Sequence, residues 1–186
     1  MAEFVNTVDV LGDDVTAAAI LDRSITEFSD DILKNIPNSV FYSCGALTMI
    51  DLPSVTSIRV NAFRNCGNLQ IARLISATVI ETSAFESCGK LRYVELGAAN
   101  LGQWAFYGCG IKALVMRHEG SCPGLNAQTF QATAIASGTG YIYVPRSMVE
   151  QYKAATNWSA YAGQIRALED YTVDGTVTGE LYLDEV

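Results

Sequence analysis

A phenylalanine followed three residues later by a cysteine recurs through the middle of this chain at an almost constant interval. The phenylalanines are 22, 22 and 21 residues apart, and they are Phe41, Phe63, Phe85 and Phe106. The cysteines keep the same steps, and they are Cys44, Cys66, Cys88 and Cys109. A fixed period of this length is typical of a solenoid, because each repeat is one coil that buries its apolar face only against its neighbours. The sequence therefore predicts stacked coils with equivalent side chains above one another.

Each repeat also predicts one short strand. Ile50-Asp51-Leu52 alternates with the period of two expected for a half-buried strand, and residues 72–74, 94–96 and 114–116 occupy the same position in later repeats. We expect these strands to stack in parallel. The interior should be filled by the phenylalanines, the small residues before them, and Ile58, Ile80 and Leu101. The glycines that follow the cysteines are expected to take positive φ in the turn, and they are Gly45, Gly67, Gly89 and Gly110.

Two columns on the outer side of this ladder mix charged, apolar and aromatic residues, as protein interfaces do. The second position of each strand reads Asp51, Arg73, Glu95, Val115 and Tyr143. The position two residues earlier reads Met49, Ile71, Tyr93, Ala113 and Tyr141. We predict that a partner binds Met49, Asp51, Ile71, Arg73, Tyr93, Glu95, Tyr141 and Tyr143. The alternative is a sheet face that neighbouring structure covers.

Charge and hydropathy narrow the classes of partner. The net charge is -8, and acidic residues gather near both ends of the chain. Because acidic segments repel phosphates, we expect no nucleic-acid binding. No apolar run is long enough for a transmembrane helix, and the first residues do not resemble a secretion signal. We expect a protein that is not exported by that route, or one trimmed from a longer precursor.

The sequence contains little from which a catalytic or metal site could be built. Cysteines at equivalent positions of parallel strands lie about 4.8 Å apart, too far for a disulfide, so we expect buried reduced thiols. His118 is the single histidine, and no zinc-binding or phosphate-binding motif occurs. Cys122 stands outside the repeat and could be exposed. A thiol-dependent enzyme using Cys122 and His118 is one alternative, but we predict no catalytic residues, no cofactor and no metal.

The solenoid needs a cover at each end, because its terminal coils expose apolar surface. We divide the chain into an N-terminal cap (1–36), repeats (37–145), a helical C-terminal cap (146–168) and an acidic tail or hairpin (169–186). Ser147 and Glu150 have the spacing of a capping box, which predicts a helix start there. A second helical stripe runs from Trp158 to Ile165, and Asp174-Gly175 favours a hairpin turn.

Across residues 38–168 the pattern resembles the BspA-type leucine-rich repeat, whose coils read Ala-Phe-x-x-Cys-x-x-Leu-x-x-Ile-x-Leu-Pro. The segment from Ile142 to Ile165 is similar to the ending of many such arrays, and Val8–Asp14 is similar to the opening of short phage and prophage members. Val40 in place of alanine and Thr133 in place of cysteine are departures. The resemblance implies an α/β-type leucine-rich-repeat solenoid, right-handed, with about five coils.

The resemblance also implies a non-enzymatic role in recognition or assembly. We expect a phage or prophage virion-associated protein (tail, baseplate or capsid-decorating) that binds a protein or a surface glycan. A bacterial cell-surface adhesin module is the alternative within the family. A structural subunit that assembles into a homo-oligomer or a lattice is a third. We therefore expect the protein to be located either in the virion or at the cell surface.

Overall fold

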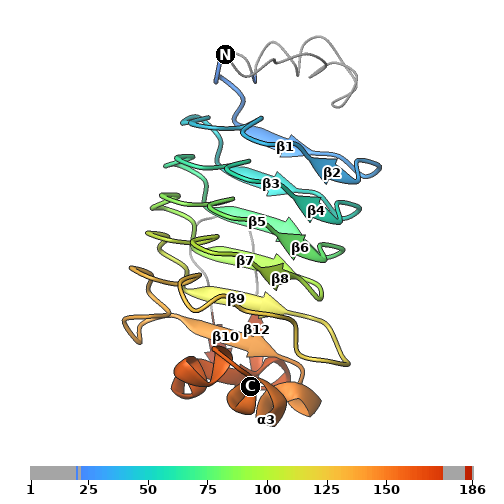
Figure 1. Cartoon of the computed structure of the whole chain (residues 1–186), viewed down its shortest axis with the longest axis vertical. Helices are drawn as coiled ribbons and strands as arrows, with labels where there is room; N and C mark the ends of the chain where they lie inside the picture. The colour runs from blue at the N-terminus through green and yellow to red at the C-terminus, as the bar shows by residue number, and fades with distance from the viewer. Residues whose placement is uncertain (1–19, 21, 174–182, 186) are drawn as a thin grey trace.

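In a computed structural model, which describes residue 20, residues 22–173 and residues 183–185, the chain winds into a stack of coils (Figure 1). Successive coils supply strands to two parallel sheets, and short helical segments close the C-terminal end. The predicted leucine-rich-repeat solenoid with a parallel ladder and a helical C-terminal cap is confirmed.

The larger sheet has seven strands, and each pairs with the equivalent strand of the next coil. In spatial order the strands are β1 (Glu27–Ser29), β3 (Met49–Asp51), β5 (Ile71–Leu74), β7 (Tyr93–Leu96), β9 (Ala113–Met116), β10 (Tyr141–Val144) and β11 (Ile165–Ala167). The register sets Ile50 beside Ala72, then Val94 and Leu114, as the repeat predicts. Equivalent residues therefore form continuous columns on both faces of this sheet.

A second sheet forms on the other side of the coils, where the sequence analysis expected none. Its four strands are β2 (Asn35–Ile36), β4 (Ser57–Ile58), β6 (Val79–Ile80) and β8 (Asn100–Leu101). Each strand has only two residues, so no alternation of apolar and polar residues is long enough to reveal it. The isolated bridge between Leu101 and Leu125 continues this ladder by one coil.

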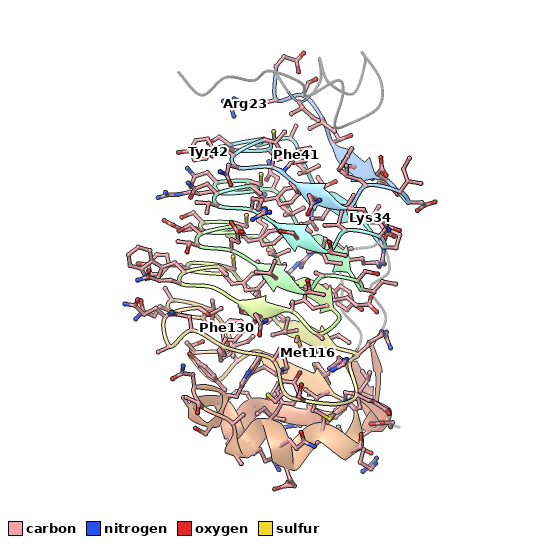
Figure 2. All side chains as sticks on the ribbon, turned by 45° about the vertical axis from the view of Figure 1, so that its right-hand side comes forward. Arg23, Lys34, Phe41, Tyr42, Met116 and Phe130 are labelled. Carbon is pink, nitrogen blue, oxygen red and sulfur yellow. The ribbon has the colours of Figure 1, made fainter. Side chains whose placement is uncertain are left out.

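The phenylalanines form a stacked column through the interior (Figure 2). Ring centroids are 4.8, 5.1 and 5.3 Å apart from Phe41 to Phe106, with planes within 9° of parallel. Phe130 extends the column at 6.0 Å, although its coil is otherwise irregular. These spacings follow the distance between parallel strands, so the sheet sets the stacking of the rings.

The repeat cysteines are buried free thiols, and three share one hydrogen-bonding role. Cys66, Cys88 and Cys109 each donate their thiol to the carbonyl of the phenylalanine one coil earlier, at 3.0, 3.1 and 3.0 Å. Burial raises the pKa of Cys44 to about 12, which keeps that thiol protonated. Thr133, which replaces cysteine in the last coil, instead donates to Phe130 in its own turn at 2.6 Å.

The prediction that glycines after the cysteines take positive φ was wrong. The left-handed residue comes immediately before the cysteine, at Ser43, Asn65, Ser87 and Gly108. A second left-handed residue comes two positions before each phenylalanine, at Ser39, Asn61, Ser83 and Trp104. The turn around each phenylalanine is therefore bracketed by two left-handed residues, mostly the serine and asparagine that fit short turns.

The C-terminal cap begins with η1 (Arg146–Met148) and continues as α3 (Val149–Ala154) and η2 (Trp158–Gln164). The predicted capping box does not form. Neither η1 nor α3 has a side-chain cap, and Glu150 accepts a hydrogen bond from Lys153 instead, at 3.0 Å. The chain enters α3 from a 3-10 turn, which leaves no N-cap position for Ser147.

Trp158 provides the central plug of this cap. Its indole is fully buried, lies 6.1 Å from the ring of Phe130, and donates to the carbonyl of Pro123 at 2.7 Å. The predicted helical stripe from Trp158 stops before Ile165, which instead begins β11 and pairs with Ile142 of β10. The cap thus also adds a strand to the sheet.

The segment before the first repeat supplies a strand to each sheet. β1 pairs with β3, β2 pairs with β4, and Phe28 lies 4.9 Å from Phe41 at the end of the ring column. Residues 1–19 and residue 21 of the predicted N-terminal cap lie outside the described residues.

After η3 (Leu168–Asp170), β12 (Tyr171–Val173) pairs antiparallel with β13 (Leu183–Glu185). The turn predicted at Asp174-Gly175 lies outside the described residues.

Candidate recognition surfaces

The outer face of the seven-stranded sheet holds the eight residues predicted to bind a partner. One column sets Met49, Ile71, Tyr93, Ala113 and Tyr141 side by side. The next sets Asp51, Arg73, Glu95, Val115 and Tyr143 side by side. The parallel register alone produces this arrangement, because equivalent residues of successive coils point to the same face. We call these two columns the outer face.

Burial divides the outer face into two parts. Ile71, Tyr93, Glu95 and Tyr143 are buried, with exposed fractions of 8%, 2%, 8% and 1%. Met49, Asp51, Arg73 and Tyr141 are half-buried. At the N-terminal edge, Glu27 and Ser29 of β1 extend the two columns and are exposed. The edge at β1 and β3 is therefore open, and the part at β7 and β10 is closed.

A hydrogen-bonded triad organises the closed part. The Tyr93 hydroxyl donates to Glu95 at 3.0 Å, and Arg117 forms an ion pair with the same carboxylate. Burial, followed by the charge of Glu95, raises the pKa of Tyr93, and the hydrogen bond to Glu95 raises the pKa of Arg117. The carboxylate is therefore neutralised within the face, which allows it to be buried.

The C-terminal segment packs against the same part of the outer face. Tyr171 of β12 lies edge-on to Tyr143, with ring centroids 5.3 Å apart, and β12 lies beside β10 (Figure 1). The guanidinium of Arg166 stacks over Tyr141 at 4.8 Å. Leu168 joins the same apolar cluster. The outer face thus receives a second layer of apolar and aromatic side chains from its own chain.

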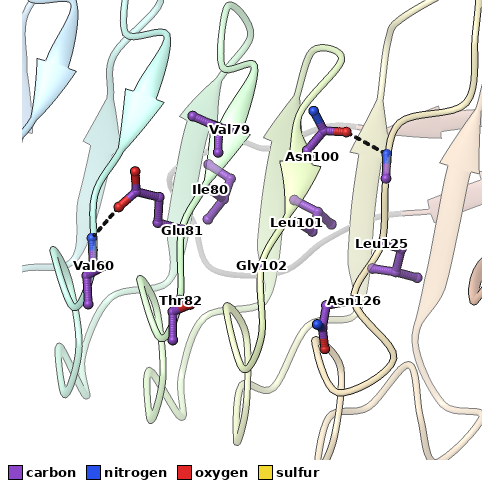
Figure 3. Close-up of a pocket in the computed structure, with 11 residues that line it drawn as sticks. Val60, Val79, Ile80, Glu81, Thr82, Asn100, Leu101, Gly102, Leu125 and Asn126 are labelled. Carbon is purple, nitrogen blue, oxygen red and sulfur yellow. Dashed lines mark hydrogen bonds between the residues drawn. The ribbon is translucent and has the colours of Figure 1, made fainter.

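A groove on the second sheet was not predicted. It has a volume of about 570 Å³ and is drawn in Figure 3, where the main lining residues are Val79, Glu81, Thr82, Asn100, Leu101, Leu125 and Asn126. Gly102 allows its coil to pack closely on the preceding one, because a Cβ there would lie 3.0 Å from the Ile80 carbonyl oxygen. No sequence signal marked this groove, because it forms where an irregular loop rejoins the ladder.

Polar side chains of this groove already accept hydrogen bonds from backbone amides of neighbouring coils. Glu81 accepts from the amide of Val60 at 3.2 Å, and its other oxygen accepts from Arg59 at 2.7 Å. Asn100 accepts from the amide of Gly124 at 2.6 Å (Figure 3). These hydrogen bonds join one coil to the next, and this structural role explains why polar residues occur at these positions.

A third surface lies on the turns that carry the phenylalanine column. Figure 2 shows Tyr42 at the edge of the stack while its neighbour Phe41 lies inside. Tyr42, Trp104 and Tyr107 are exposed there, at 36%, 39% and 39%. Sequence reasoning missed them because it followed the interior columns, although their offset from the repeated phenylalanines could have marked them.

The residues of the alternative thiol site do not form a catalytic arrangement. The Cys122 thiol is half-buried and contacts the carbonyl of Pro123 at 3.8 Å, and no hydrogen bond to His118 occurs within the described residues. Burial raises the pKa of Cys122 to about 11, which opposes the thiolate needed for attack.

Within residues 22–173, no group of three or more potential ligands is placed to hold a metal ion. In that same range, every helix is too short or too polar to cross a bilayer.

Comparison with known proteins identifies the repeat. The sequence model for the BspA type leucine rich repeat region matches residues 22–136 in six copies. The match begins before Phe41 and includes β1 and β2, which agrees with their pairing in the two sheets. No curated protein matches the chain.

Proposed function

The chain belongs to the BspA-type leucine-rich repeat family, and from that membership we propose that it binds a protein partner through the open part of its outer face. Leucine-rich repeats of this kind point to a protein-binding or recognition module. The proposed contact residues are Met49 and Asp51 at the centre, with Glu27, Ser29 and Arg73 around them. Of the other predicted contact residues, Tyr93, Glu95, Tyr141 and Tyr143 belong to the closed part. Ile71 of β5 is buried between the two parts.

One observation carries this proposal: the outer face already packs against a segment of its own chain. Tyr143 and Tyr171 are in edge contact at 5.3 Å, and Leu168 packs in the same cluster. The two columns continue without a break into β3 and β1, where their side chains are half-buried or exposed. A surface that holds an apolar segment at one end has the shape and chemistry to hold another at its open end.

The open part combines an apolar centre with paired charge. Met49 supplies a flexible apolar side chain, while Asp51 and Arg73 lie 3.7 Å apart as an ion pair. The Arg73 guanidinium also approaches the sulfur of Met49 at 3.8 Å. This mixture of apolar and charged groups is typical of transient protein interfaces. The partner we expect offers an apolar side chain flanked by a basic group that reaches Asp51.

The test is site-specific crosslinking in the full-length protein. A photoreactive phenylalanine at position 49 should crosslink to the partner in extracts of the source cells or in purified particles. The same group at Gln151, an exposed residue of α3, is the control and should not. Met49→Glu with Asp51→Arg should abolish capture without changing the melting temperature. Equal crosslinking from both positions, or undiminished capture by the double variant, would place the interface elsewhere.

Tyr93 is unsuited to such a test, although the sequence analysis placed it in the interface. Because its side chain is 2% exposed, Tyr93→Ala changes packing as well as any binding. Substitutions at Met49 and Asp51 avoid this problem because both side chains are partly accessible.

The setting we propose is a phage or prophage virion. It is supported by the likeness of Val8–Asp14 to the opening of short phage members, and those residues lie outside the described structure. Mass spectrometry of purified, induced particles should then find the protein in the virion. Recovery in a cell-wall fraction, with an export signal or wall anchor in the native reading frame, would favour the adhesin alternative. In either setting we propose a non-enzymatic role.

A further inference from the structure

Two aromatic side chains project from a single turn of the fourth coil. Trp104 and Tyr107 are each 39% exposed, and the amide of Tyr107 donates to the carbonyl of Trp104 at 3.1 Å to close the turn. Ala105 and Phe106 between them are fully buried in the core. The turn thus separates its side chains cleanly, with two inside and two outside. We call Trp104 and Tyr107 the aromatic pair.

Trp104 serves neither the backbone nor the core at its position. Its φ is 54°, in the left-handed region, where the equivalent residues of earlier coils are Ser39, Asn61 and Ser83. A bulky side chain in this region is strained, whereas asparagine and serine tolerate it. The residue remains 39% exposed and lies outside the buried core clusters. Strain of this kind is held mainly at functional sites, so the contribution of Trp104 lies in its exposed ring.

The next coil has carboxamide residues at the positions equivalent to the aromatic pair. Gln128 corresponds to Trp104 and Gln131 to Tyr107, and the backbone carbonyl of Gln131 accepts from the amide of Gly108 at 3.1 Å. The amide nitrogen of Gln103 donates to the oxygen of Gln128 at 2.5 Å. This bond uses one donor of Gln103 and one acceptor of Gln128, and each carboxamide can both donate and accept further bonds.

On the other side the pair meets the preceding coil, in which Glu86 forms an ion pair with Arg64 at 2.8 Å. The two rings are therefore bounded by glutamines and a carboxylate. A stable protein interface needs a wider continuous apolar centre than two isolated rings provide. Two aromatic rings surrounded by polar residues instead suit a ligand that is itself polar but has small apolar faces.

We propose that the aromatic pair and its glutamines bind a neutral hexose oligosaccharide. A pyranose ring has a face of C–H groups that can stack on an indole or phenol ring and leave water. Its hydroxyl groups both donate and accept hydrogen bonds, as the neighbouring carboxamides do. Arg64 and Glu86 neutralise each other, so this ion pair gives the site no net charge with which to select an acidic sugar. This site is separate from the outer face and does not depend on the proposed protein interface.

The two tryptophans of the chain make a direct test possible, because Trp104 is exposed and Trp158 is fully buried. Acrylamide should quench only the fluorescence of Trp104. The full-length protein is titrated with cellohexaose, maltohexaose and mannohexaose, and with the reduced form of each constituent monosaccharide. We expect at least one hexasaccharide to shift the emission to the blue and to protect Trp104 from acrylamide. No response to any of the hexasaccharides overturns the proposal.

Variants separate stacking from a general effect on the fold. Trp104→Asn, which copies Asn61, should weaken the responding sugar about tenfold or more by calorimetry, with no loss of melting temperature. Tyr107→Ser should also weaken binding, and Met49→Glu with Asp51→Arg should leave it unchanged. If the Trp104→Asn variant binds the sugar as strongly as the unchanged protein, the proposed site is wrong. Protection of Trp104 by a protein partner in place of a sugar would overturn the ligand class.

Discussion

The third and fourth turns of the solenoid are the same inside and different outside. Ala84, Phe85 and Cys88 in the third turn correspond to Ala105, Phe106 and Cys109 in the fourth, and all are buried. At the two flanking positions the third turn has Ser83, which is buried, and Glu86, which is half-buried, whereas the fourth turn has the exposed Trp104 and Tyr107. The interior of a stacked coil must match its neighbours, because each ring packs on the next. The exterior has no such constraint, so differences between coils are tolerated there.

The largest effect should come from breaking the shared interior. Phe85→Ala leaves a hole between two rings, each about 5 Å away, and should lower the free energy of unfolding by roughly 3–5 kcal/mol. Urea denaturation measures this loss. Glu86→Ala, at the next residue of the same turn, removes a half-buried ion pair with Arg64 but no core packing, so it should cost less than Phe85→Ala. Equal losses for the two variants would contradict the separation of interior from exterior.

The buried thiols predict the next effect, a fall in stability at alkaline pH. The pKa of Cys44 rises from an ordinary value of 9.0 to about 12 on folding, mainly because of burial. Above pH 9 the unfolded chain therefore releases a proton that the folded chain keeps, so unfolding becomes more favourable as pH rises from 9 to 12. Below pH 9 this group gives no pH dependence.

Denaturation midpoints measured from pH 7 to 11 test this effect. Cys44→Ala should make the alkaline decline shallower without removing it, because the pKa values of Cys66 and Cys88 also rise on folding. Iodoacetamide should label the repeat cysteines only after unfolding. A midpoint that stays level up to pH 11, or rapid labelling of the folded protein, would show that these thiols are accessible.

A smaller effect sharpens the comparison between the closed and open parts of the outer face. Tyr93→Phe removes the hydroxyl that donates to Glu95 at 3.0 Å and should cost about 1.5 kcal/mol, because a buried carboxylate loses a donor. Met49→Ala, in the same column but half-buried, should cost less. If thermal unfolding shows no loss for Tyr93→Phe, the triad with Arg117 does not stabilise the closed part.

The smallest effect has the opposite sign. Trp104→Asn relieves a bulky residue with φ of 54° and should raise the free energy of unfolding by about 1 kcal/mol. Ser83→Trp, the reverse change one coil earlier, should lower it by a similar amount or more, because Ser83 is buried. Urea midpoints measure both variants. A destabilised Trp104→Asn variant would mean that the indole contributes to packing.

Some features of the fold could be read from particular residues. The period of the phenylalanines placed the rings of the column from Phe41 to Phe106, and the alternation at Ile50-Asp51-Leu52 gave the register of the larger sheet. The turn geometry could not be read in the same way. The glycines after the cysteines suggested left-handed positions there, but Ser43 and Asn65 take that role. Both residue types tolerate the conformation, so the pattern did not decide between them.

The candidate site shows the same division. The sequence by itself determined which side chains share the outer face, because a parallel ladder with a fixed period places equivalent residues in one column. Only the tertiary structure decided which of them are accessible. Tyr93 and Met49 occupy the same column, yet Tyr93 is 2% exposed and Met49 is half-buried. Accessibility depends on contacts such as that of Tyr171 with Tyr143, which join segments outside the repeat to the repeat itself and so leave no periodic trace in the sequence.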